Sequence, residues 1–259
     1  MNNSESFREK GGNKTRTRSK LKIRSYCSED REAVRTICKI TAFRNRGYSI
    51  FFEDGELFAD YWTDAYLRFE PDLCFVAEKE GKVVGYLLGC SDSNRFFNLM
   101  KKRILPELLI KLLSRLLTLR YRDPRTFRSL RWVILKSRKE FPSIPVDRFP
   151  AHFHANIIRE GSFQQGYSAL LLRFLDELGK RSVPGLYGIV LEPVAGGTFS
   201  KLISKFNALG LKSEYYSECT SSMYKFVLHD QTPMVNRVYA CPLEIWRGFV
   251  HYISKCYNL

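Results

Sequence analysis

Two histidines and one glutamate are the residues of this sequence whose types and spacing best suit proton transfer. His152 and His154 stand two positions apart at the predicted strand 153–158, so both side chains share one face. The ordinary pKa of histidine, about 6.5, suits acceptance of a proton at neutral pH. Glu192 follows a second apolar run, 186–191, and is the third candidate. The alternative is that the two histidines are packed or hydrogen-bonded at a sheet edge.

Metal chemistry is not expected from these residues. No third ligand lies near the histidine pair in the sequence, and a zinc site needs at least three protein ligands. The seven cysteines are odd in number and form no Cys-x-x-Cys pair, which argues against a structural zinc site or a disulfide scaffold. We expect no metal cofactor and reduced thiols in a cytoplasmic protein.

A phosphate-binding turn is predicted directly after the histidines. The strand 153–158 is followed by a short loop and by a helix that opens at Gly166. Unpaired N–H groups at a helix N-terminus, together with the helix dipole, form a site that suits phosphate. A glycine there lets the backbone approach a ligand closely. Many such turns bind nothing, so the order of the surrounding elements has to decide.

The periodicity of apolar residues predicts an α/β fold with a mixed sheet and helices on its faces. Strands are predicted at 21–25, 73–78, 83–90, 153–158, 186–191, 215–219 and 223–228. Helices are predicted after an N-cap at Ser28, at 57–68, 166–181 and 199–209, and after Pro242. The runs 73–78 and 83–90 form the clearest hairpin.

This arrangement resembles the GNAT superfamily of acetyl-CoA-dependent N-acetyltransferases. The family's phosphate loop reads Arg/Gln-x-x-Gly-x-Gly/Ala, and residues 163–168 match it strictly only at Gly166. Residues 152–156 look like the His-x-His-Ile-Asn strand of one GNAT branch, and 205–211 resembles the family's Phe-Tyr-x-x-x-Gly-Phe helix end. The resemblance covers about 20–229, apart from a basic insert, and implies a mostly antiparallel, twisted sheet.

The resemblance implies an N-acetyltransferase in which a primary amine attacks the thioester of acetyl-CoA directly. Acetyl-CoA is the expected co-substrate, and it would lie in a slot between diverging fourth and fifth strands. Its pantetheine arm would pair with Asn156, Ile157 and Ile158. Its pyrophosphate would lie on backbone N–H groups of Gln164, Gln165, Gly166, Tyr167 and Ser168. His152, His154 or Glu192 would accept the proton of the amine.

One departure from the family keeps a rival interpretation open. Phe206 stands where many members carry a tyrosine that protonates the leaving thiolate, and a phenylalanine cannot do so. Water or another residue would then supply the proton. The rival interpretation is a non-catalytic acyl-CoA-binding or adaptor module.

The expected acceptor side is the loop 48–55 and the aromatic residues that follow it. Glu53 and Asp54 are expected to hold an amine by charge, with help from cation–π contacts to the aromatic rings. Phe58 and Trp62 equally suit a role as core residues beneath the loop.

The charge of the chain is concentrated in two segments. The formal net charge is +15 over 259 residues, of which 44% are apolar, enough for a folded core. Residues 1–24 carry a net charge of +6 and residues 95–140 a net charge of +11, so the rest is close to neutral. We predict a disordered basic tail at 1–19, a GNAT-like domain at 20–230 with a helical insert at 95–148, and a C-terminal extension with a helix at 231–259.

The predicted insert combines an apolar helix face with many basic residues. Seven leucines between Leu105 and Leu117 share one face, and the second segment, 123–140, has arginines on its outer side. Such a face has to be covered by the domain, by a second subunit in a homodimer, or by an anionic lipid surface that residues 105–139 would contact. No nucleic-acid motif is present, and no apolar stretch is long enough to span a membrane.

Overall fold

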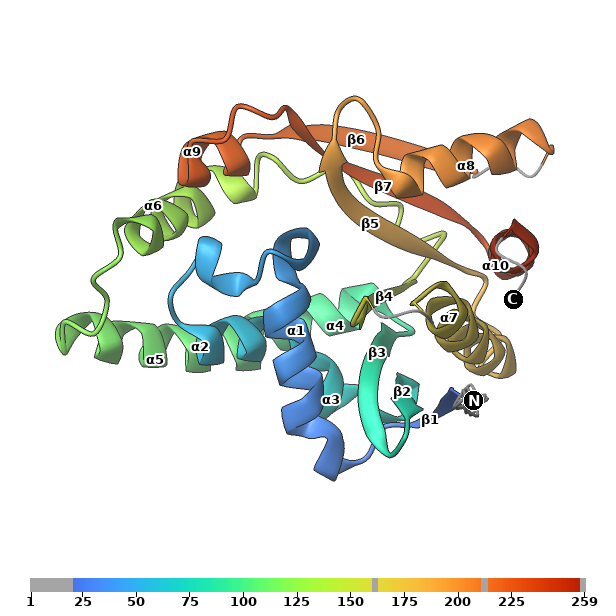
Figure 1. Ribbon diagram of the computed structural model, residues 1–259, viewed down its shortest axis with the longest axis horizontal. Helices are drawn as coiled ribbons and strands as arrows, with labels where there is room; N and C mark the ends of the chain where they lie inside the picture. Colours follow the sequence, from blue (N-terminus) through green and yellow to red (C-terminus); the bar gives the residue numbers. More distant parts are fainter. Residues whose placement is uncertain (1–20, 160–162, 211–213, 257–259) are drawn as a thin grey trace, which may run out of the picture.

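Alternation along the strands creates a sheet with two buried faces. The computed structural model describes residues 21–159, 163–210 and 214–256, and a seven-stranded sheet of order β1-β2-β3-β4-β5-β7-β6 runs through it (Figure 1). The strands are β1 (Lys22–Ser25), β2 (Cys74–Lys79), β3 (Lys82–Cys90), β4 (Ala151–Ile157), β5 (Gly185–Pro193), β6 (Tyr215–Ser221) and β7 (Met234–Pro242). Only β4 and β5 pair in parallel, so the prediction of a mixed, mostly antiparallel sheet flanked by helices is confirmed.

Helices cover both faces of this sheet. They are α1 (Arg31–Asn45), α2 (Gly55–Ala59), α3 (Ala65–Phe69), α4 (Ser93–Leu99), α5 (Leu105–Leu117), α6 (Pro124–Trp132), α7 (Phe163–Lys180), α8 (Thr198–Ala208), α9 (Met223–Leu228) and α10 (Leu243–Cys256). A π-helical turn, η3 (Asp60–Asp64), joins α2 to α3, and η5 (Met100–Ile104) joins α4 to α5. No helix of the described ranges is long and apolar enough to cross a membrane.

Strand β2 shows how the two apolar layers are separated. Phe75 and Ala77 belong to the cluster formed with α7 and α10, whereas Cys74 and Val76 belong to the cluster formed with α1 and α3. This follows from the period of two along a strand. Neither face of β2 is left to solvent.

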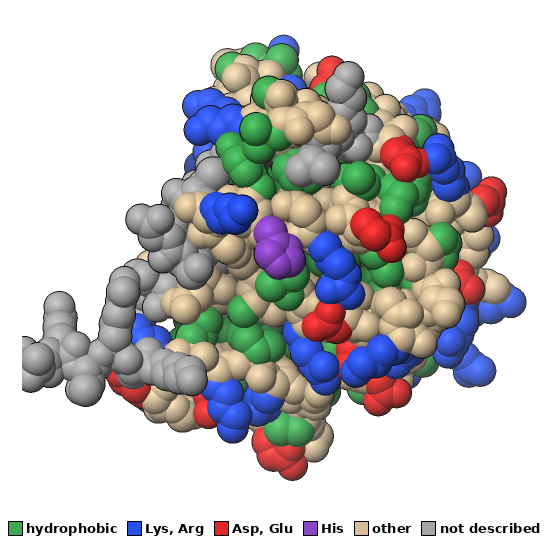
Figure 2. Space-filling model, turned by 90° about the vertical axis from the view of Figure 1, so that its right-hand side faces the viewer, with side chains coloured by type: hydrophobic (Ala, Val, Ile, Leu, Met, Phe, Trp, Pro, Cys, Tyr) green, Lys and Arg blue, Asp and Glu red, His purple; other side chains and the backbone are tan. Residues whose placement is uncertain are grey.

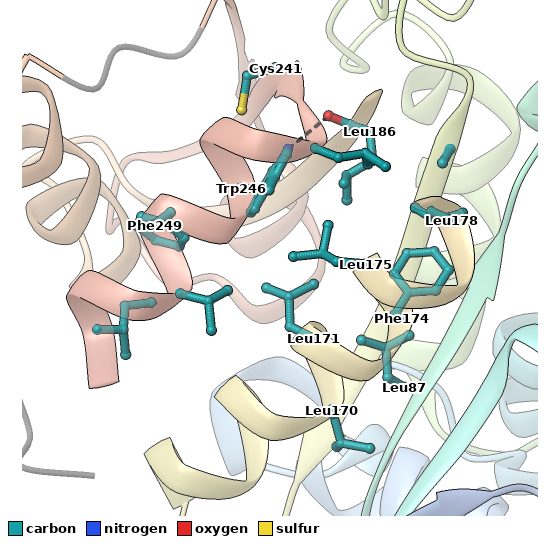
Figure 3. Packing of buried hydrophobic residues seen from close by; sticks show 14 of the residues in the cluster. Leu87, Leu170, Leu171, Phe174, Leu175, Leu178, Leu186, Cys241, Trp246 and Phe249 are labelled. Carbon is teal, nitrogen blue, oxygen red and sulfur yellow. Dashed lines mark hydrogen bonds between the residues drawn. The ribbon is translucent and has the colours of Figure 1, made fainter. Parts of the chain in front are cut away.

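The layer beneath α7 and α10 is the larger of the two apolar cores (Figure 3). Leu171, Phe174 and Leu175 of α7 are fully buried against it, and Trp246 of α10 donates a hydrogen bond from Nε1 to the Leu186 carbonyl at 2.9 Å. The indole thus satisfies its one polar group while its ring fills the core. Cys241 lies in the same cluster.

Three predictions near the chain ends are wrong. Residues 223–228, expected to be a strand, form helix α9, and the true partner of β5 and β6 is β7, which was not predicted. Because β7 is an inner strand and α10 packs on α7, residues 231–256 are part of the domain rather than an extension. At the other end, Cys27 rather than Ser28 is the N-cap. The predicted tail 1–19 lies outside the described residues.

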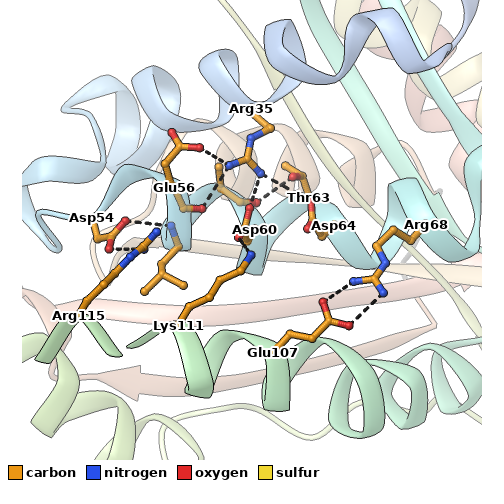
Figure 4. Close-up of polar contacts among 12 residues, drawn as sticks. Arg35, Asp54, Glu56, Asp60, Thr63, Asp64, Arg68, Glu107, Lys111 and Arg115 are labelled. Carbon is orange, nitrogen blue, oxygen red and sulfur yellow. Dashed lines mark hydrogen bonds and ion pairs between the residues drawn. The ribbon is translucent and has the colours of Figure 1, made fainter. Parts of the chain in front are cut away.

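The segment between β3 and β4 forms α4, α5 and α6, but α5 is attached by its polar face (Figure 4). Lys111 Nζ lies 2.7 Å from Asp60 Oδ2, and Arg115 is paired with Asp54. Arg68 holds Glu107 through two hydrogen bonds, 2.7 and 3.0 Å long. The polar face of α5 is therefore held on the domain by ion pairs.

The apolar side of α5 is exposed as a consequence. Its outward aliphatic side chains are between 41% and 84% exposed; they are Leu105, Leu109, Ile110, Leu113 and Leu117, and together they are called the leucine face below. The remaining leucines, Leu108, Leu112 and Leu116, are half-buried. Within the described residues, the domain does not cover the leucine face.

Candidate active site

The parallel strands β4 and β5 separate soon after they meet. They pair only at Ala151 with Leu186 and at His152 with Tyr187, although β4 continues to Ile157 and β5 to Pro193. The two strands therefore diverge into a slot, as the resemblance to the GNAT superfamily implies. Backbone groups on the inner edges of the slot have no strand partner there, so a linear ligand can pair with them as an added strand.

The backbone of β4 turns only alternate residues toward this slot. The N–H of Ile158 donates to the Val84 carbonyl on the β3 side at 2.9 Å. Because N–H and C=O groups of successive residues point to opposite sides of a strand, the N–H of Asn156 also points to β3. Of the three predicted pantetheine-binding residues, only Ile157 directs its backbone into the slot, and Ala155 joins it there.

A cavity of about 340 Å³ opens beside β4, on the side of α1. Its polar lining includes His154, Asn156, Arg159 and Tyr224, and its apolar lining includes Trp62. No aspartate or glutamate is among the described residues that line it. The cavity is thus partly apolar and, where it is charged, positive.

His154 is the predicted proton acceptor that faces this cavity. Its Nε2 lies 3.1 Å from Nδ2 of Asn156, and the same amide nitrogen donates to the hydroxyl of Tyr86 at 2.8 Å. The ring of Trp62 packs on the imidazole with centroids 5.2 Å apart. Burial lowers the pKa of His154 to about 4, against a hydrogen bond to the Trp62 backbone that raises it. The imidazole is neutral at pH 7.

His152 shares the strand face of His154 but lies outside the cavity. Its Nδ1 is 2.7 Å from Ser93 Oγ, and its ring stacks between Phe97 and Tyr187. Burial lowers the pKa of His152 to about 3, and the charge of His154 adds to this. The structure therefore supports the alternative for His152, a packed and hydrogen-bonded histidine, and removes it from the proton acceptors.

Glu192 does not face the slot. Its carboxylate accepts a hydrogen bond from Ser200 Oγ at the start of α8 and pairs with Arg237 of β7 at 3.1 Å. The neighbouring residue Leu191 lines the cavity, and alternation along β5 turns Glu192 to the opposite face. This geometry does not support Glu192 as a base; the residue links α8 to β7.

The N-terminus of α7 meets the end of β4 at the edge of the cavity. A Cβ on Gly166 would lie 3.1 Å from side-chain atoms of both Ile157 and Leu21, so this glycine is needed for close helix–strand packing. Tyr167 lines the cavity, and burial raises its pKa to about 12. Ser168 is buried, and its Oγ has no hydrogen-bond partner in the described part of the chain.

The first turn of α7 extends further than predicted. The helix begins at Phe163, three residues before Gly166, so the N–H groups of Gln164 and Gln165 are first-turn groups without helical acceptors. Gln165 is exposed, whereas the side chain of Gln164 lies outside the described residues. Free N–H groups and the orphaned Ser168 hydroxyl are donors that fit a pyrophosphate.

The end of α1 forms the opposite wall of the cavity through an unusual turn. Phe43, Arg44 and Asn45 all have left-handed backbone conformations, with φ of 50°, 64° and 65°. Each such residue without a glycine costs about 1 kcal/mol or more. Phe43 holds the turn by packing on Phe51, with ring centroids 5.0 Å apart. The strain places Arg44 and Asn45 at the cavity edge.

The two carboxylates expected to hold an amine are engaged elsewhere. Asp54 caps α2 through the N–H of Leu57, pairs with Arg115 and accepts a hydrogen bond from Tyr121. Glu53 accepts hydrogen bonds from backbone N–H groups at the start of α6. Both acids hold α5 and α6 in place, and neither lines the cavity.

The aromatic residues of the predicted acceptor side divide between cavity and core. Phe58 and Trp62 line the cavity, and Trp62 is exposed. Tyr66 is buried, with its ring centroid 4.4 Å from that of Phe96. Phe206, at the position of the family's tyrosine, is buried against Phe249 and is not among the residues that line this cavity. The sequence analysis missed Arg159 and Tyr224 as lining residues. Tyr224 was placed in a predicted strand, and no sequence pattern distinguishes Arg159 from the other arginines.

Known structures share this architecture. No family model matches the sequence. The structure of SsHAT is 24% identical, with a TM-score of 0.53 over 85% of this chain and 98% of that chain. An N-acetyltransferase from Staphylococcus aureus Mu50 is 16% identical (TM-score 0.48; 87% and 99% covered). Salmonella typhimurium YncA, solved with acetyl-CoA, is 12% identical (TM-score 0.43; 86% and 94% covered).

The strand order, the diverging β4 and β5 and the similarity to SsHAT define the fold. The chain has the GNAT fold of N-acetyltransferases.

Proposed function

We propose that the protein is an acyltransferase that moves the acetyl group of acetyl-CoA to an amine. The observation that carries this proposal is the slot between β4 and β5, which leads from the N-terminus of α7 into the cavity that contains His154. The slot has unpaired backbone edges for a linear arm, and α7 offers donors for a pyrophosphate. No group of three metal-ligating side chains is present among the described residues, and the proposed reaction requires none.

The backbone of β4 positions the thioester, and the cavity positions the amine. Ala155 and Ile157 offer backbone groups on the slot side, which would hold the pantetheine arm and orient the carbonyl. The amine nitrogen attacks the carbonyl carbon, the new C–N bond forms, and the C–S bond to the thiolate breaks. The amine loses one proton, and the thiolate gains one.

His154 is the proposed acceptor of the amine proton, directly or through one water. Its neutral ring is ready to accept, and Asn156 holds it in place. An amide presents either NH₂ or oxygen depending on its orientation, so Asn156 can support both the neutral and the protonated ring. Tyr224 replaces Phe206 as the proposed proton donor to the thiolate, because it lines the same cavity and burial raises its pKa, keeping it protonated.

The test is release of CoA from acetyl-CoA in the presence of a panel of amines. Wild-type protein should release CoA with at least one amine, and His154→Ala should lower kcat/KM about 10²-fold. Because the pKa of His154 is lowered to about 4, its titration should not make the rate rise between pH 6 and 7. This corrects the expectation from an ordinary histidine. An unchanged rate in His154→Ala would assign proton acceptance to water.

The rival function, a non-catalytic acyl-CoA-binding module, is separated by the same experiment. Such a module would be stabilised by acetyl-CoA, with a rise in Tm, but would release no CoA with any amine. Gly166 is unsuited to this test, because a side chain there disturbs packing against Ile157 whether or not a ligand binds. Ser168→Ala is the better variant: it removes one hydroxyl that has no partner, so it should weaken acetyl-CoA binding without unfolding the protein.

A further inference from the structure

Three arginines surround a second hollow, of about 200 Å³, that adjoins the cavity of His154. They are Arg44 and Arg46 from the end of α1 and Arg159 from the end of β4. The hollow and the cavity share Arg44, Arg159 and Tyr224 as lining residues, so the two spaces meet at these side chains.

Among the described residues that line the hollow, three are arginines and one, Asp230, is an acid. Asp230 lies 3.6 Å from Arg46, and its pKa is lowered first by the Thr232 backbone N–H and further by the charge of Arg46. Asp230 is thus the partner of Arg46. Arg44 makes no hydrogen bond or ion pair within the described residues, and its guanidinium is exposed.

The strained turn at the end of α1 explains why Arg44 is where it is. Three successive left-handed residues without a glycine persist only when their surroundings hold them, and Phe43 does so by packing on Phe51 and Phe58. An ordinary helical end would direct Arg44 elsewhere. Strain that places one charged side chain at a cavity edge is a common mark of a binding site.

We propose that the amine acceptor carries an anionic group, a carboxylate or a phosphate, which binds at Arg44, Arg46 and Arg159 while its amine reaches His154. This inference rests on the proposed function. Among the described residues that line the cavity there is no carboxylate, which a cationic acceptor such as a diamine would need. Guanidinium groups bind carboxylate and phosphate by paired N–H donors.

The acceptor class is tested with four small amines that differ in the group beyond the amine: ethanolamine, cadaverine, β-alanine and O-phosphoethanolamine. CoA release should show kcat/KM at least about 10-fold higher for an anionic amine than for ethanolamine, with cadaverine lowest. Arg44→Gln should remove most of this preference, Arg44→Lys should retain part of it, and Arg120→Gln, an exposed arginine outside the hollow, should change nothing.

Two outcomes would overturn the proposal. One is equal or better turnover of cadaverine. The other is an Arg44→Gln variant whose KM rises for acetyl-CoA and not for the acceptor, which would assign the arginines to a phosphate of CoA. If no amine releases CoA, the proposed function fails, and the anion site is then tested by ligand binding alone. O-phosphoethanolamine should still raise the Tm of the wild-type protein but not that of Arg44→Gln. No rise in the wild-type protein would refute the site.

The leucine face of α5 carries a second, independent inference. The ion pairs with Asp54, Asp60 and Arg68 hold the polar side of α5 on the domain and so fix the leucine face outward. Lys101, Lys102 and Arg103 precede this helix and are exposed, and Arg120 and Arg122 follow it. Glu107 is the one acid between Arg95 and Arg122, and it is paired with Arg68.

We infer that the leucine face docks on an anionic lipid surface. Aliphatic side chains framed by basic residues at both ends suit the boundary between headgroups and acyl chains. A second copy of the chain fits less well, because a pair of α5 helices would bring basic ends together with no free acid to compensate them. By contrast, acidic and basic side chains are intermixed on the face of the protein that Figure 2 shows.

Vesicle co-sedimentation tests the lipid surface. We expect binding to phosphatidylcholine vesicles that contain about 30% phosphatidylserine, weaker binding at high salt, and little binding to phosphatidylcholine alone. Ile110→Ser/Leu117→Ser and Lys102→Gln/Arg103→Gln should each reduce binding about 10-fold or more, whereas Leu209→Ser, at an exposed leucine of another region, should not. No sedimentation with any vesicle, with or without a dimer in solution, would refute the inference; a dimer lost in Ile110→Ser/Leu117→Ser would assign the face to a second copy.

Discussion

Helices α7 and α5 meet the rest of the protein by opposite faces. Helix α7 buries Leu171, Phe174 and Leu175 against the sheet and α10, and its charged residues face solvent or form surface pairs (Figure 3). Helix α5 turns Lys111 and Arg115 inward to buried carboxylates and leaves its leucines outside (Figure 4). Apolar burial is non-directional and tolerant of pH and salt, whereas ion pairs depend on both. The attachment of α5 should therefore be the condition-sensitive part of the fold.

The largest effect is expected in the apolar layer. Phe174→Ala should lower the free energy of unfolding by about 3–5 kcal/mol, because a fully buried ring is replaced by a cavity. Leu113→Ala, in the leucine face, should change it by less than about 0.5 kcal/mol. Urea unfolding measures both. An equal loss of unfolding free energy in the two variants would mean that the leucine face is buried in solution. The contrast between α7 and α5 would then be wrong.

The buried end of the α5 network should come next. Asp60 bonds both Arg35 and Lys111, and Arg35 is almost fully buried. Asp60→Ala would leave the Arg35 charge without its closest partner and should cost about 3 kcal/mol. Glu107→Gln weakens an exposed pair and should cost about 1 kcal/mol or less. If the two variants unfold at the same urea concentration, the buried pair contributes no more than a surface one.

Acid should loosen the contact of α2 with α1 before it affects α7. Hydrogen bonds from Lys39 and Arg35 of α1 lower the pKa of Glu56 in α2 to about 2, from an ordinary value of about 4.5. A carboxylate with a lowered pKa in the folded state stabilises the fold above pH 4.5, and this stabilisation is lost as the pH falls toward 2. Amide hydrogen exchange at pH 5 and pH 3, corrected for intrinsic rates, should show protection lost first in α2. Glu56→Gln should show a smaller change between the two pH values.

Salt should have the smallest effect. At about 1 M salt the screening length falls to about 3 Å, so the exposed pair of Arg68 and Glu107 should weaken, whereas the buried pair at Asp60 should weaken less. Exchange of α5 amides should rise a few-fold at most, and exchange in α7 should stay constant. A larger response in α7 would contradict the assignment of its stability to apolar packing.

Sequence patterns predicted elements better than orientations. Six strands, β1 to β6, were predictable, because alternating apolar runs bounded by turns identify strands. The slot between β4 and β5 was expected only from the resemblance to the GNAT superfamily. Strand β7 was not predictable, because Asn236 and Arg237 interrupt its apolar pattern. Arg237 is buried with Glu192 and Glu218 as partners, which no local pattern reveals. The short apolar run 223–228 suits a helix as well as a strand. For α5 the pattern showed an apolar face, but it did not show that buried carboxylates would bind the basic side chains on the opposite face of the helix.

The candidate site was predictable in part for the same reason. The period of two placed His152 and His154 on one face, yet it could not show that Phe97 and Tyr187 enclose His152 while the cavity reaches only His154. Glu53 and Asp54 were suitable candidates by residue type, but they bind Arg122 and Arg115, which lie 69 and 61 residues further along the chain.

The buried cysteines allow the opening of each of the two apolar layers to be timed by chemical modification. Cys38, Cys74 and Cys90 are buried in the layer beneath α1, and Cys241 is buried in the layer beneath α7 and α10. Burial raises the pKa of each of these thiols, to about 11 for Cys38, so alkylation requires opening of the surrounding structure. Pulsed alkylation read by peptide mass spectrometry would time the opening of the two layers separately, in one unmodified protein. Exposed Cys27 would react at once and serve as the internal reference.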